Sequence, residues 1–541
     1  MTRVLAFSFF FSTLLLSPEV LSAKVTLEYG TFVGYDNYGH DANTTLPNPV
    51  VAYLNIPYAA PPTGQRRFRH PQAPLKFNGS FNSTVYGPAC PQPGVLNIDE
   101  DCLTLAVYAP KGTKSSDKLP VVIWFHGGAF NAGSKNQISL ASMVSGAPVK
   151  YVAVGVNYRL GAYGWLPSNL TQKAGLLNLG LYDQAYAIGW VQKHIKSFGG
   201  NPEQVTLFGQ SAGGTTVGYH MFHVEERPKF KRVIMDSGAP TARAIPDWTY
   251  PVYQTQMSEF LNLTGCSRGN DEIATFSCLR EIPQSTITNA SLSIFAKYYG
   301  GLGIYPFQIV VDRKYISQAA HLSWESGRFH KMPILTGFNT NEANALVPRN
   351  LNTTSDFLGF LKGLLPLLSD SHLAKIEQLY PAPELSASPY ANSPLSPHFL
   401  RIAAAYGDLS YIAQVQATSI YASKAKVPVW KYHFDHLTPG AESWIGVNHT
   451  SELAFVSKLW ANKFTGQVAD QSRLMNAYWS SFIVSGDPNA RVPENTPVWP
   501  QYVFNNQTEL RLANGTAYPQ RDDFRREALD FWRGIPEILM H

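Results

Sequence analysis

Short, uninterrupted apolar runs recur along the chain and predict buried strands. They occupy residues 119–125, 151–157, 205–208, 232–236, 332–338 and 427–434. Continuous hydrophobicity, rather than alternation of apolar and polar residues, is typical of strands that are covered on both faces, as in a parallel sheet. The pattern therefore indicates a central sheet that is largely parallel.

A helical pattern separates the second and third of these runs. In DQAYAIGWVQKHIKSFGG the apolar positions keep a helical spacing: Ile188, Val191, Ile195 and Phe198. Asp183 is the predicted N-cap, and Gly199-Gly200 the predicted stop. Strand, helix and strand in this order predict an open α/β sheet with right-handed crossovers.

No internal repeat, low-complexity tract or Pro/Ser/Gly-rich linker marks a domain boundary. The segment Pro381–His398 comes nearest, but it is flanked by strand-like runs of one kind and is interpreted as an irregular insertion. We therefore expect one domain over residues 24–541, although length alone would allow three or four domains.

The first 23 residues have the composition of a secretory signal peptide. Arg3 precedes an apolar run from Val4 to Leu16, and small residues follow, with cleavage expected near Ser22 or Ala23. The run is short for a membrane span, no later stretch is apolar for long enough, and the C-terminal residues carry no lipid-anchor signal. These features predict a secreted, extracellular protein without a membrane span.

Ten Asn-x-Ser/Thr acceptor sites agree with a secretory route. Nine of them are expected to be available for N-linked glycans: Asn43, Asn78, Asn82, Asn169, Asn262, Asn289, Asn352, Asn506 and Asn514. The tenth, Asn448, is considered below. Charged residues form only 15% of the chain, against roughly 25% in an average soluble protein, and surface sugars would supply the missing solubility.

Charge, cysteine content and the absence of certain motifs argue against nucleic-acid, metal and nucleotide binding. The net charge of +5 is spread along the chain without a large basic cluster, so no nucleic-acid partner is expected. The four cysteines form two equally spaced pairs, Cys90/Cys102 and Cys266/Cys278. They permit three connectivities, and the low entropic cost of closing short loops favours two local disulfides. No metal-binding or nucleotide-binding motif is present, and no cofactor is expected.

The predicted strand at 205–208 leads directly into a G-x-S-x-G motif, Gly209 to Gly213. A sharp turn after a buried strand would lift the hydroxyl of Ser211 above the edge of the sheet. The motif alone is weak, because chance supplies about 0.2 matches in a chain of this length. A second match, around Ser267, has no preceding strand and includes Cys266, so Ser267 is predicted to be a loop residue. Ser211 is the candidate nucleophile.

A serine nucleophile needs donors for the oxyanion of the tetrahedral intermediate. His126-Gly127-Gly128-Ala129 follows the strand at 119–125 and supplies a glycine-rich loop. The expected oxyanion hole uses the backbone N–H groups of Gly128, Ala129 and Ala212. A simple tight turn is the alternative interpretation of this loop.

Taken together, these residues resemble the type-B carboxylesterase/lipase family, the α/β-hydrolases that include cholinesterases and fungal lipases. The resemblance runs from about Leu27 to the C-terminus, and it most resembles the secreted fungal carboxylesterases. Its motifs occur in order: EDCL (100–103), HGGAF, NYRLGAYGWL (157–166), NLGLYDQ, FGGNPEQVTLFGQSAGG, MDSG and YWSSFIVSGDPN (478–489). It implies the α/β-hydrolase fold, a mostly parallel central sheet flanked by helices. The two local cysteine pairs also fit the family pattern.

The resemblance also implies a triad in the order serine, acid, histidine. The acidic motif matches GFNTNEA and assigns the acid to Glu342, although Asn341 and Ala343 replace the more usual Asp and Gly. The histidine motif G-x-x-H-x-x-E-L matches Gly446 to Leu453 and assigns the base to His449. His436, at the end of the strand 427–434, is the alternative base.

His449 lies inside an acceptor site, Asn448-His449-Thr450, because Thr450 stands where the family usually has Gly. A glycan on Asn448 would need an outer loop, whereas a catalytic His449 needs a cleft. If His449 is the base, Asn448 is expected to carry no glycan.

Departures from the family narrow the expected substrate. Cholinesterases have Glu where this chain has Gln210, and an aromatic residue in a long first disulfide loop, whereas 91–101 has no aromatic residue. The same loop forms a long lid in fungal lipases. We therefore expect hydrolysis of small to medium, uncharged carboxylic esters by water through an acyl-serine intermediate. By analogy with the family, Gly301–Phe307 would line the acyl side.

Two alternatives remain open. The enzyme could process an ester or lactone of a particular natural product, or transfer the acyl group to an alcohol. The superfamily also contains adhesion proteins that lack the serine and bind partners through their surface. The intact set Ser211, Glu342 and His449 argues against that second alternative.

Overall fold

The computed structural model describes residues 22–540 except 42–43, 243–244 and 303–304. All but the last two residues of the predicted signal peptide therefore lie outside the described residues, as does Asn43. Ser22 and Ala23 already belong to the first strand, β1 (Ser22–Leu27).

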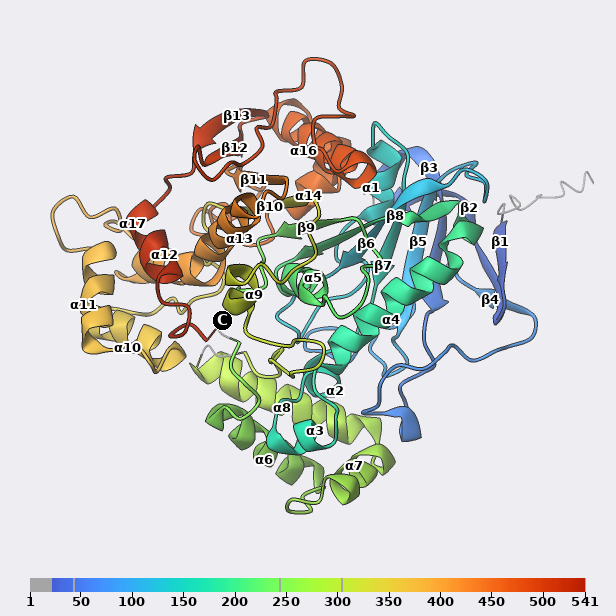
Figure 1. Ribbon diagram of the computed structural model, residues 1–541, viewed down its shortest axis with the longest axis horizontal. Coiled ribbons are helices and arrows are strands. Elements are labelled where there is room, and N and C mark those ends of the chain that lie inside the picture. Colours follow the sequence, from blue (N-terminus) through green and yellow to red (C-terminus); the bar gives the residue numbers. More distant parts are fainter. Residues whose placement is uncertain (1–21, 42–43, 243–244, 303–304, 541) are drawn as a thin grey trace, which may run out of the picture.

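One thirteen-stranded sheet runs through the molecule (Figure 1). Its order is β1-β2-β3-β5-β7-β6-β8-β9-β10-β11-β12-β13, with β4 pairing β2. The other strands are β2 (Gly30–Asp41), β3 (Thr44–Pro57), β4 (Ser80–Asn82), β5 (Thr104–Pro110), β6 (Leu119–Phe125), β7 (Val152–Val156), β8 (Gly200–Gln210), β9 (Arg232–Asp236), β10 (Ile334–Asn339), β11 (Val429–Phe434), β12 (Thr508–Ala513) and β13 (Thr516–Arg521).

The predicted parallel centre is confirmed, because each pair of adjacent strands between β7 and β12 in this order is parallel. The sheet edges differ from the centre. β1, β2, β3, β5 and β7 pair antiparallel along one side, and β12 pairs β13 antiparallel at the other. The apolar runs predicted the strands from β6 to β11, and neither β12 nor the edges of the sheet.

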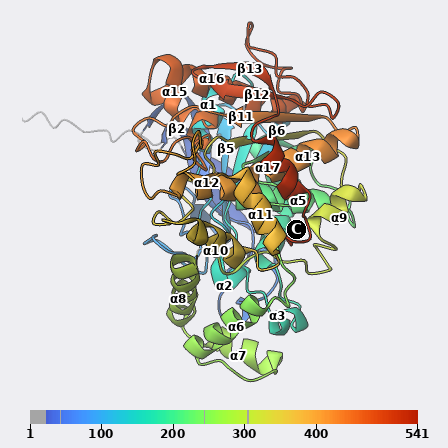
Figure 2. The same ribbon diagram turned by 90° about the vertical axis from the view of Figure 1, so that its left-hand side faces the viewer.

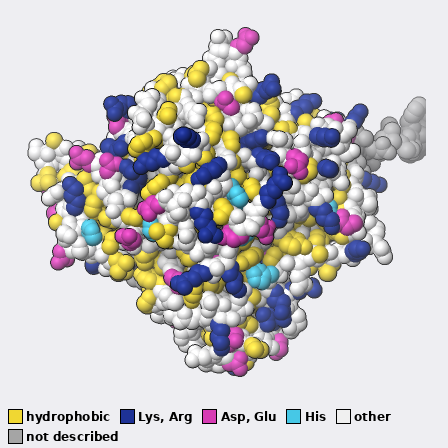
Figure 3. All heavy atoms as spheres, in the orientation of Figure 1, with side chains coloured by type: hydrophobic (Ala, Val, Ile, Leu, Met, Phe, Trp, Pro, Cys, Tyr) yellow, Lys and Arg dark blue, Asp and Glu magenta, His cyan; other side chains and the backbone are white. Residues whose placement is uncertain are grey.

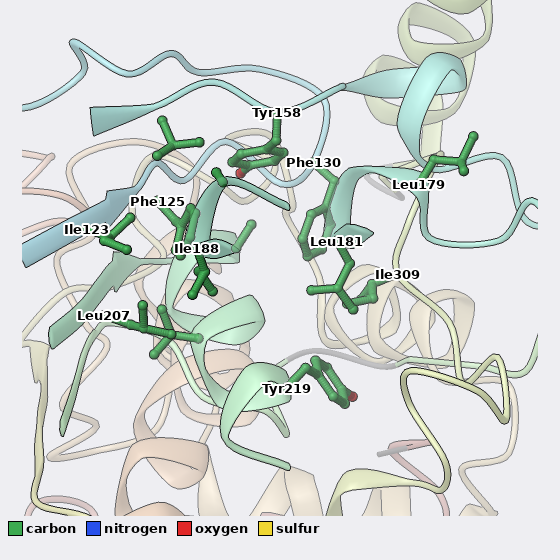
Figure 4. Packing of buried hydrophobic residues seen from close by; sticks show 14 of the residues in the cluster. Ile123, Phe125, Phe130, Tyr158, Leu179, Leu181, Ile188, Leu207, Tyr219 and Ile309 are labelled. Carbon is green, nitrogen blue, oxygen red and sulfur yellow. The ribbon is translucent and has the colours of Figure 1, made fainter. Parts of the chain in front are cut away.

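Helices cover both faces of the sheet, which explains the continuous hydrophobicity of the strands. On β6, Val121, Ile123 and Phe125 belong to the core under α4 (Leu179–His194) and α5 (Ala212–Phe222). Figure 4 shows Ile123 and Phe125 among the buried side chains that include Ile188 of α4 and Tyr219 of α5. Val122 and Trp124, between them, belong to the core under α16 (Gly466–Ser485). Successive side chains of a strand point to opposite faces, so both sets must be apolar.

Some of the remaining helices also pack on the sheet, and others extend the molecule beyond it. Those grouped at the lower end of Figures 1 and 2 are α2 (Gly161–Gly164), α3 (Asn169–Lys173), α6 (Pro251–Thr264), α7 (Glu272–Glu281) and α8 (Gln284–Leu302). A further core lies among α10 (Thr354–Leu364), α11 (Asp370–Leu379), α12 (Phe399–Gly407), α13 (Ala413–Lys424) and α17 (Arg526–Arg533). Shorter helices are α1 (Leu140–Gly146), α9 (Ala320–Glu325), α14 (Leu453–Val456) and α15 (Leu459–Lys463).

The predicted helix after β7 is present, but its predicted start is wrong. α4 begins at Leu179 after Asn178, one turn before Asp183. Asp183 is fully buried and accepts from the Nε and Nη2 atoms of Arg159, each at 2.7 Å. A carboxylate that accepts two hydrogen bonds in a bidentate arrangement is the best partner for a buried guanidinium. Asp183 is therefore an ion-pair partner of Arg159 and not a helix cap. The predicted stop is confirmed, since Gly199 has a φ of 83° after a short 3-10 turn.

Both predicted disulfides are present, Cys90–Cys102 and Cys266–Cys278. The second closes the connection between α6 and α7, and Ser267 is exposed there, which confirms its assignment as a loop residue. No helix within the described ranges combines the length and hydrophobicity that a membrane crossing requires.

Candidate active site

Ser211 stands on a strained turn between β8 and α5. Its backbone has φ 56° and ψ −126°, a conformation that a side-chain-bearing residue rarely adopts. The turn closes tightly around it: a Cβ on Gly209 would lie 2.3 Å from the Gly213 backbone, and one on Gly213 would lie 2.0 Å from the Phe125 oxygen. Both glycines of the motif are therefore required by packing. The turn places Ser211 at the carboxyl edge of the sheet.

The loop His126–Ala129 lies directly against Ser211. A Cβ on Gly127 would come within 3.0 Å of the Ser211 Cβ, and Gly128 has a φ of 104°. Its carbonyl accepts the N–H groups of Asn131 and Ala132, each at 3.0 Å. Ala129 is also in the left-handed region, with a φ of 54°. Gly128 and Ala129, two of the predicted oxyanion-hole residues, thus follow Gly127 in this loop, and the third, Ala212, directly follows Ser211.

Two amide side chains anchor that loop. The carbonyl of Ala129 accepts from Asn131 Nδ2 at 2.7 Å and from Gln308 Nε2 at 3.0 Å. The same two amides donate to the carbonyl of Pro306. The segment 306–308 thus braces the loop. Nothing in the sequence pattern identified Asn131 or Gln308.

Glu342 follows β10 and is buried. Its Oε1 accepts the backbone N–H of Asn339 at 2.7 Å, and its Oε2 lies 2.6 Å from Nδ1 of His449. Asn341, a departure from the family pattern, connects the two segments: its N–H donates to Val447 O at 2.8 Å, and its Oδ1 accepts from Val447 N at 3.0 Å. The substitution of Asp by Asn is therefore accommodated by the backbone of the histidine loop.

The structure brings His449, and not His436, to the acid. Nδ1 of His436 accepts the backbone N–H of Asn514 at 3.1 Å, and its ring packs against Phe455. His449 has Glu342 on one ring nitrogen, and its Nε2 lies 3.3 Å from Nε2 of Gln210. Gln210 is adjacent to Ser211 in the chain, so the imidazole lies close to the turn between β8 and α5 that carries Ser211.

Tyr411 covers the imidazole, at 4.4 Å between ring centroids. It lies on a single π-helical turn, Asp408–Ile412, between α12 and α13. Asp408 at the start of the turn accepts from Tyr380 Oη at 2.7 Å and from Arg525 Nε at 2.8 Å. π-Turns often occur at functional sites because they displace a side chain from its helical position. Sequence reasoning missed Tyr411, since nothing in its surroundings distinguishes it.

Two further buried carboxyls lie behind the acid. Glu452 accepts from the Nδ2 of Asn339, and burial, followed by the neighbouring Glu342 charge, raises the pKa of Glu452 to about 8. Asp236 accepts from Trp479 Nε1 at 3.0 Å, and burial raises its pKa well above the ordinary value. Burial therefore favours the neutral form of both carboxyls. Glu452 belonged to the histidine motif, but no role was predicted for it.

The acceptor sites differ in exposure. Asn448 is half-buried, its carbonyl accepts from Asn339 Nδ2 at 2.9 Å, and its Oδ1 is buried. The eight other described acceptor residues are exposed: Asn78, Asn82, Asn169, Asn262, Asn289, Asn352, Asn506 and Asn514. Asn448 is the exception among them.

Free space beside Ser211 is small. A cavity of about 10 Å³ is lined by residues that include Phe130, Ile245, Gln308, Ile309 and Tyr411. This volume holds about one water molecule. The predicted acyl-side segment Gly301–Phe307 ends directly before Gln308 and Ile309, while Gly303 and Ile304 lie outside the described residues. In the part of the chain that is described, no group of His, Cys, Asp and Glu is arranged to hold a metal.

A mostly parallel sheet, a serine on a strand-to-helix elbow, and a buried acid–histidine pair at its carboxyl edge define an α/β-hydrolase. The carboxylesterase family model matches residues 21–532, so the chain belongs to the carboxylesterase family and is a carboxylic ester hydrolase. The structure is similar to that of EstA from Aspergillus niger, with a TM-score of 0.82, 26% identity and coverage of 96% of this chain and 99% of that one.

Curated relatives extend the comparison along nearly the whole chain. Secreted lipase 4 of Gibberella zeae is 36% identical over 96% of both chains. Acetylcholinesterase of Electrophorus electricus is 31% identical over 93% of this chain and 88% of its own. The family therefore spans both lipases and cholinesterases, and the choice of ester must come from the site.

Proposed function

We propose that this protein is a secreted serine carboxylesterase in which Ser211, His449 and Glu342 form the catalytic triad. The observation that carries the proposal is the 2.6 Å contact between His449 Nδ1 and Glu342 Oε2, next to a strained serine elbow. A carboxylate on Nδ1 holds the imidazole in the tautomer whose Nε2 can accept a proton.

In the proposed reaction, His449 takes the proton of Ser211 as its oxygen attacks the ester carbonyl. The N–H groups of Gly128, Ala129 and Ala212 stabilise the oxyanion. The protonated imidazole then donates to the departing alcohol, which leaves an acyl-serine. Water, activated by the same imidazole, releases the carboxylate and restores the free serine.

The proposed substrates are small to medium, uncharged esters. The cavity of about 10 Å³ at Ser211 favours a short acyl group, because a longer one requires the surrounding side chains to move. The neutral Gln210 provides no charge to attract a cationic ester. Hydrolysis of a lactone or natural-product ester, or acyl transfer to an alcohol, would use the same residues.

Secretion and glycosylation belong to the same proposal. The predicted signal peptide over residues 1–23 and the exposed acceptor asparagines support an extracellular glycoprotein. Asn448 is proposed to carry no glycan, because its side chain is partly buried and its neighbour contacts Glu342. The proposed mature chain, 24–541, is a single catalytic domain.

The test is an assay of the secreted protein on p-nitrophenyl butyrate beside Ser211→Ala and Ser267→Ala. The proposal expects Ser211→Ala to lose activity by about a thousandfold or more, and Ser267→Ala to match the wild type. An active, folded Ser211→Ala protein would contradict the assignment of the nucleophile.

A lipase is the second candidate function, because relatives at 36% and 30% identity are named secreted lipases. The tip of the short Cys90–Cys102 loop exposes Leu96 completely and Val95 in part, an apolar contact that an oil–water interface would favour. Rates on dissolved p-nitrophenyl butyrate and on emulsified triacylglycerol separate the candidates. A lipase would hydrolyse the emulsion faster, and Leu96→Ser would reduce that rate alone.

A further inference from the structure

A large cavity of the described structure lies apart from Ser211. Its volume is about 880 Å³, within the range of small-molecule sites, and it shares no lining residue with the cavity beside the nucleophile. Helix α4 forms one wall, and the segments around His70, Phe230 and Tyr315 form the others. The face that carries α4 is the one shown in Figure 3, where apolar side chains are exposed between groups of Lys and Arg.

Glycine in the middle of α4 keeps this cavity open. Gly189 lines it, and a Cβ at that position would meet no atom within 4 Å. Glycine inside a helix is destabilising relative to alanine, and no close contact within the described residues requires it. Ala185 and Gly189, one turn apart, face the cavity together, so a strip along the helix is left without bulk.

The floor and the rim of the cavity differ in chemistry. Tyr29, Tyr58, Trp190 and Phe230 are buried and supply aromatic walls. The lining also contains five cationic side chains and only two carboxylates. Glu28 pairs with Lys193, and Glu226 lies 3.5 Å from Lys229.

Three of the cations, Lys76, Arg227 and Lys314, have no acidic partner among the described residues. The excess positive charge at the rim complements the charged group of an anionic amphiphile. The aromatic walls below the rim complement its apolar chain. The strip from Ala185 to Lys193 spans about 12 Å along the helix axis, which suits an extended chain.

We propose that this cavity is a second ligand site, which binds a linear amphiphilic carboxylate of medium chain length. The chain lies along Ala185 and Gly189 against the aromatic wall, and the carboxylate faces the cationic rim. The site is independent of the catalytic triad, so ligand binding does not require an active Ser211.

The test measures decanoate binding to the full-length protein by isothermal titration calorimetry. We expect one equivalent to bind, and decyltrimethylammonium, a cation of equal chain length, to bind at least tenfold more weakly. Gly189→Leu places a bulky side chain in the open space beside α4 and should weaken decanoate binding at least tenfold. Gly359→Leu is the matched control, because Gly359 is exposed on α10 and also has open space for a Cβ.

Both glycine variants should keep wild-type hydrolysis of p-nitrophenyl butyrate. If Gly189→Leu does not fold by circular dichroism, the triple charge reversal Lys76→Glu, Arg227→Glu and Lys314→Glu decides, with a loss of at least tenfold expected. Unchanged decanoate binding in a folded variant would overturn the proposal. The proposal would also be overturned if decyltrimethylammonium bound as tightly as decanoate. It would be overturned as well if decanoate inhibited ester hydrolysis competitively in both the wild type and Gly189→Leu.

Discussion

The Nε2 atom of His449 lies 3.3 Å from the Nε2 atom of Gln210, the residue directly before the serine. With Nδ1 of the imidazole on Glu342, Nε2 is left to accept, and the Gln210 amide donates to it. Gln210 is fully buried, and its Oε1 has no partner in the described part of the chain. Position 210 therefore determines the charge beside His449, the proposed base.

Replacement of Gln210 by Glu should change the choice of substrate. A buried carboxylate next to the imidazole would attract a cationic ester, and an exchange of a neutral for a charged neighbour is worth about 1–2 kcal/mol at an effective dielectric constant near 20 over several Å. We expect Gln210→Glu to raise kcat/KM for butyrylcholine about tenfold relative to its uncharged analogue, 3,3-dimethylbutyl butyrate. The ratio of the two kcat/KM values measures the effect.

The control is Gln204→Glu, a change of the same kind on β8 that is remote from the elbow in sequence. It should leave the ratio unchanged. An unchanged ratio in Gln210→Glu as well would mean that the charge of residue 210 does not reach the bound substrate.

His449→Ala should abolish ester hydrolysis, because it removes the only imidazole that contacts Glu342 in the described structure. We expect a loss of about a thousandfold or more in kcat, the usual effect of removing a triad member. His436→Ala should keep most of its activity, since His436 contacts Asn514 and Phe455 instead. The two kcat values on p-nitrophenyl butyrate, with folding checked by circular dichroism, decide between the two bases.

Much of this site was predictable because its groups follow buried strands. Ser211 follows β8 and Glu342 follows β10, and both strands contain a short apolar run and end at the same edge of a parallel sheet. Periodicity located the strands and motifs located the residues. His449 required the family motif, because a histidine in a loop has no local pattern that identifies it.

What could not be predicted depends on contacts between distant segments. Tyr411 covers His449 from a π-turn that Arg525 holds in place, more than 110 positions later in the chain. The antiparallel strands β1 to β3 were missed because their outer positions are polar and interrupt the apolar runs. Asp183 has the residue type of a cap, but a buried Arg159 competes for it.

Thr450→Gly should stabilise the protein and leave it active. Thr450 has a φ of 78°, and a β-branched side chain in this region costs about 1–2 kcal/mol. Glycine removes that strain at some cost in unfolded-state entropy, so we expect a gain of up to about 1 kcal/mol and a higher Tm. The variant also destroys the acceptor site at Asn448.

Mass spectrometry of the peptide that contains Asn448 completes this measurement. We expect the wild-type peptide to carry no sugar and Thr450→Gly to hydrolyse p-nitrophenyl butyrate at the wild-type rate. Thr450→Ala serves as the control. It removes the acceptor site, keeps the strain and should show no gain in Tm.

Glu452 should make the protein less stable as the pH rises. Burial and the charge of Glu342 raise its pKa from 4.5 to about 8, so the folded state retains a proton that the unfolded state releases between these values. Stability contributed by the neutral form is complete below pH 4.5 and is lost as the pH rises toward 8. Gln is neutral at every pH. The free energy of unfolding of Glu452→Gln should therefore rise relative to that of the wild type as the pH increases from 4.5 to 8, by a few kcal/mol at pH 8. Urea unfolding at pH 5, 6.5 and 8 measures the difference, with Glu494→Gln on the surface as control. A constant difference across the three pH values would show that Glu452 is ionised in the folded protein.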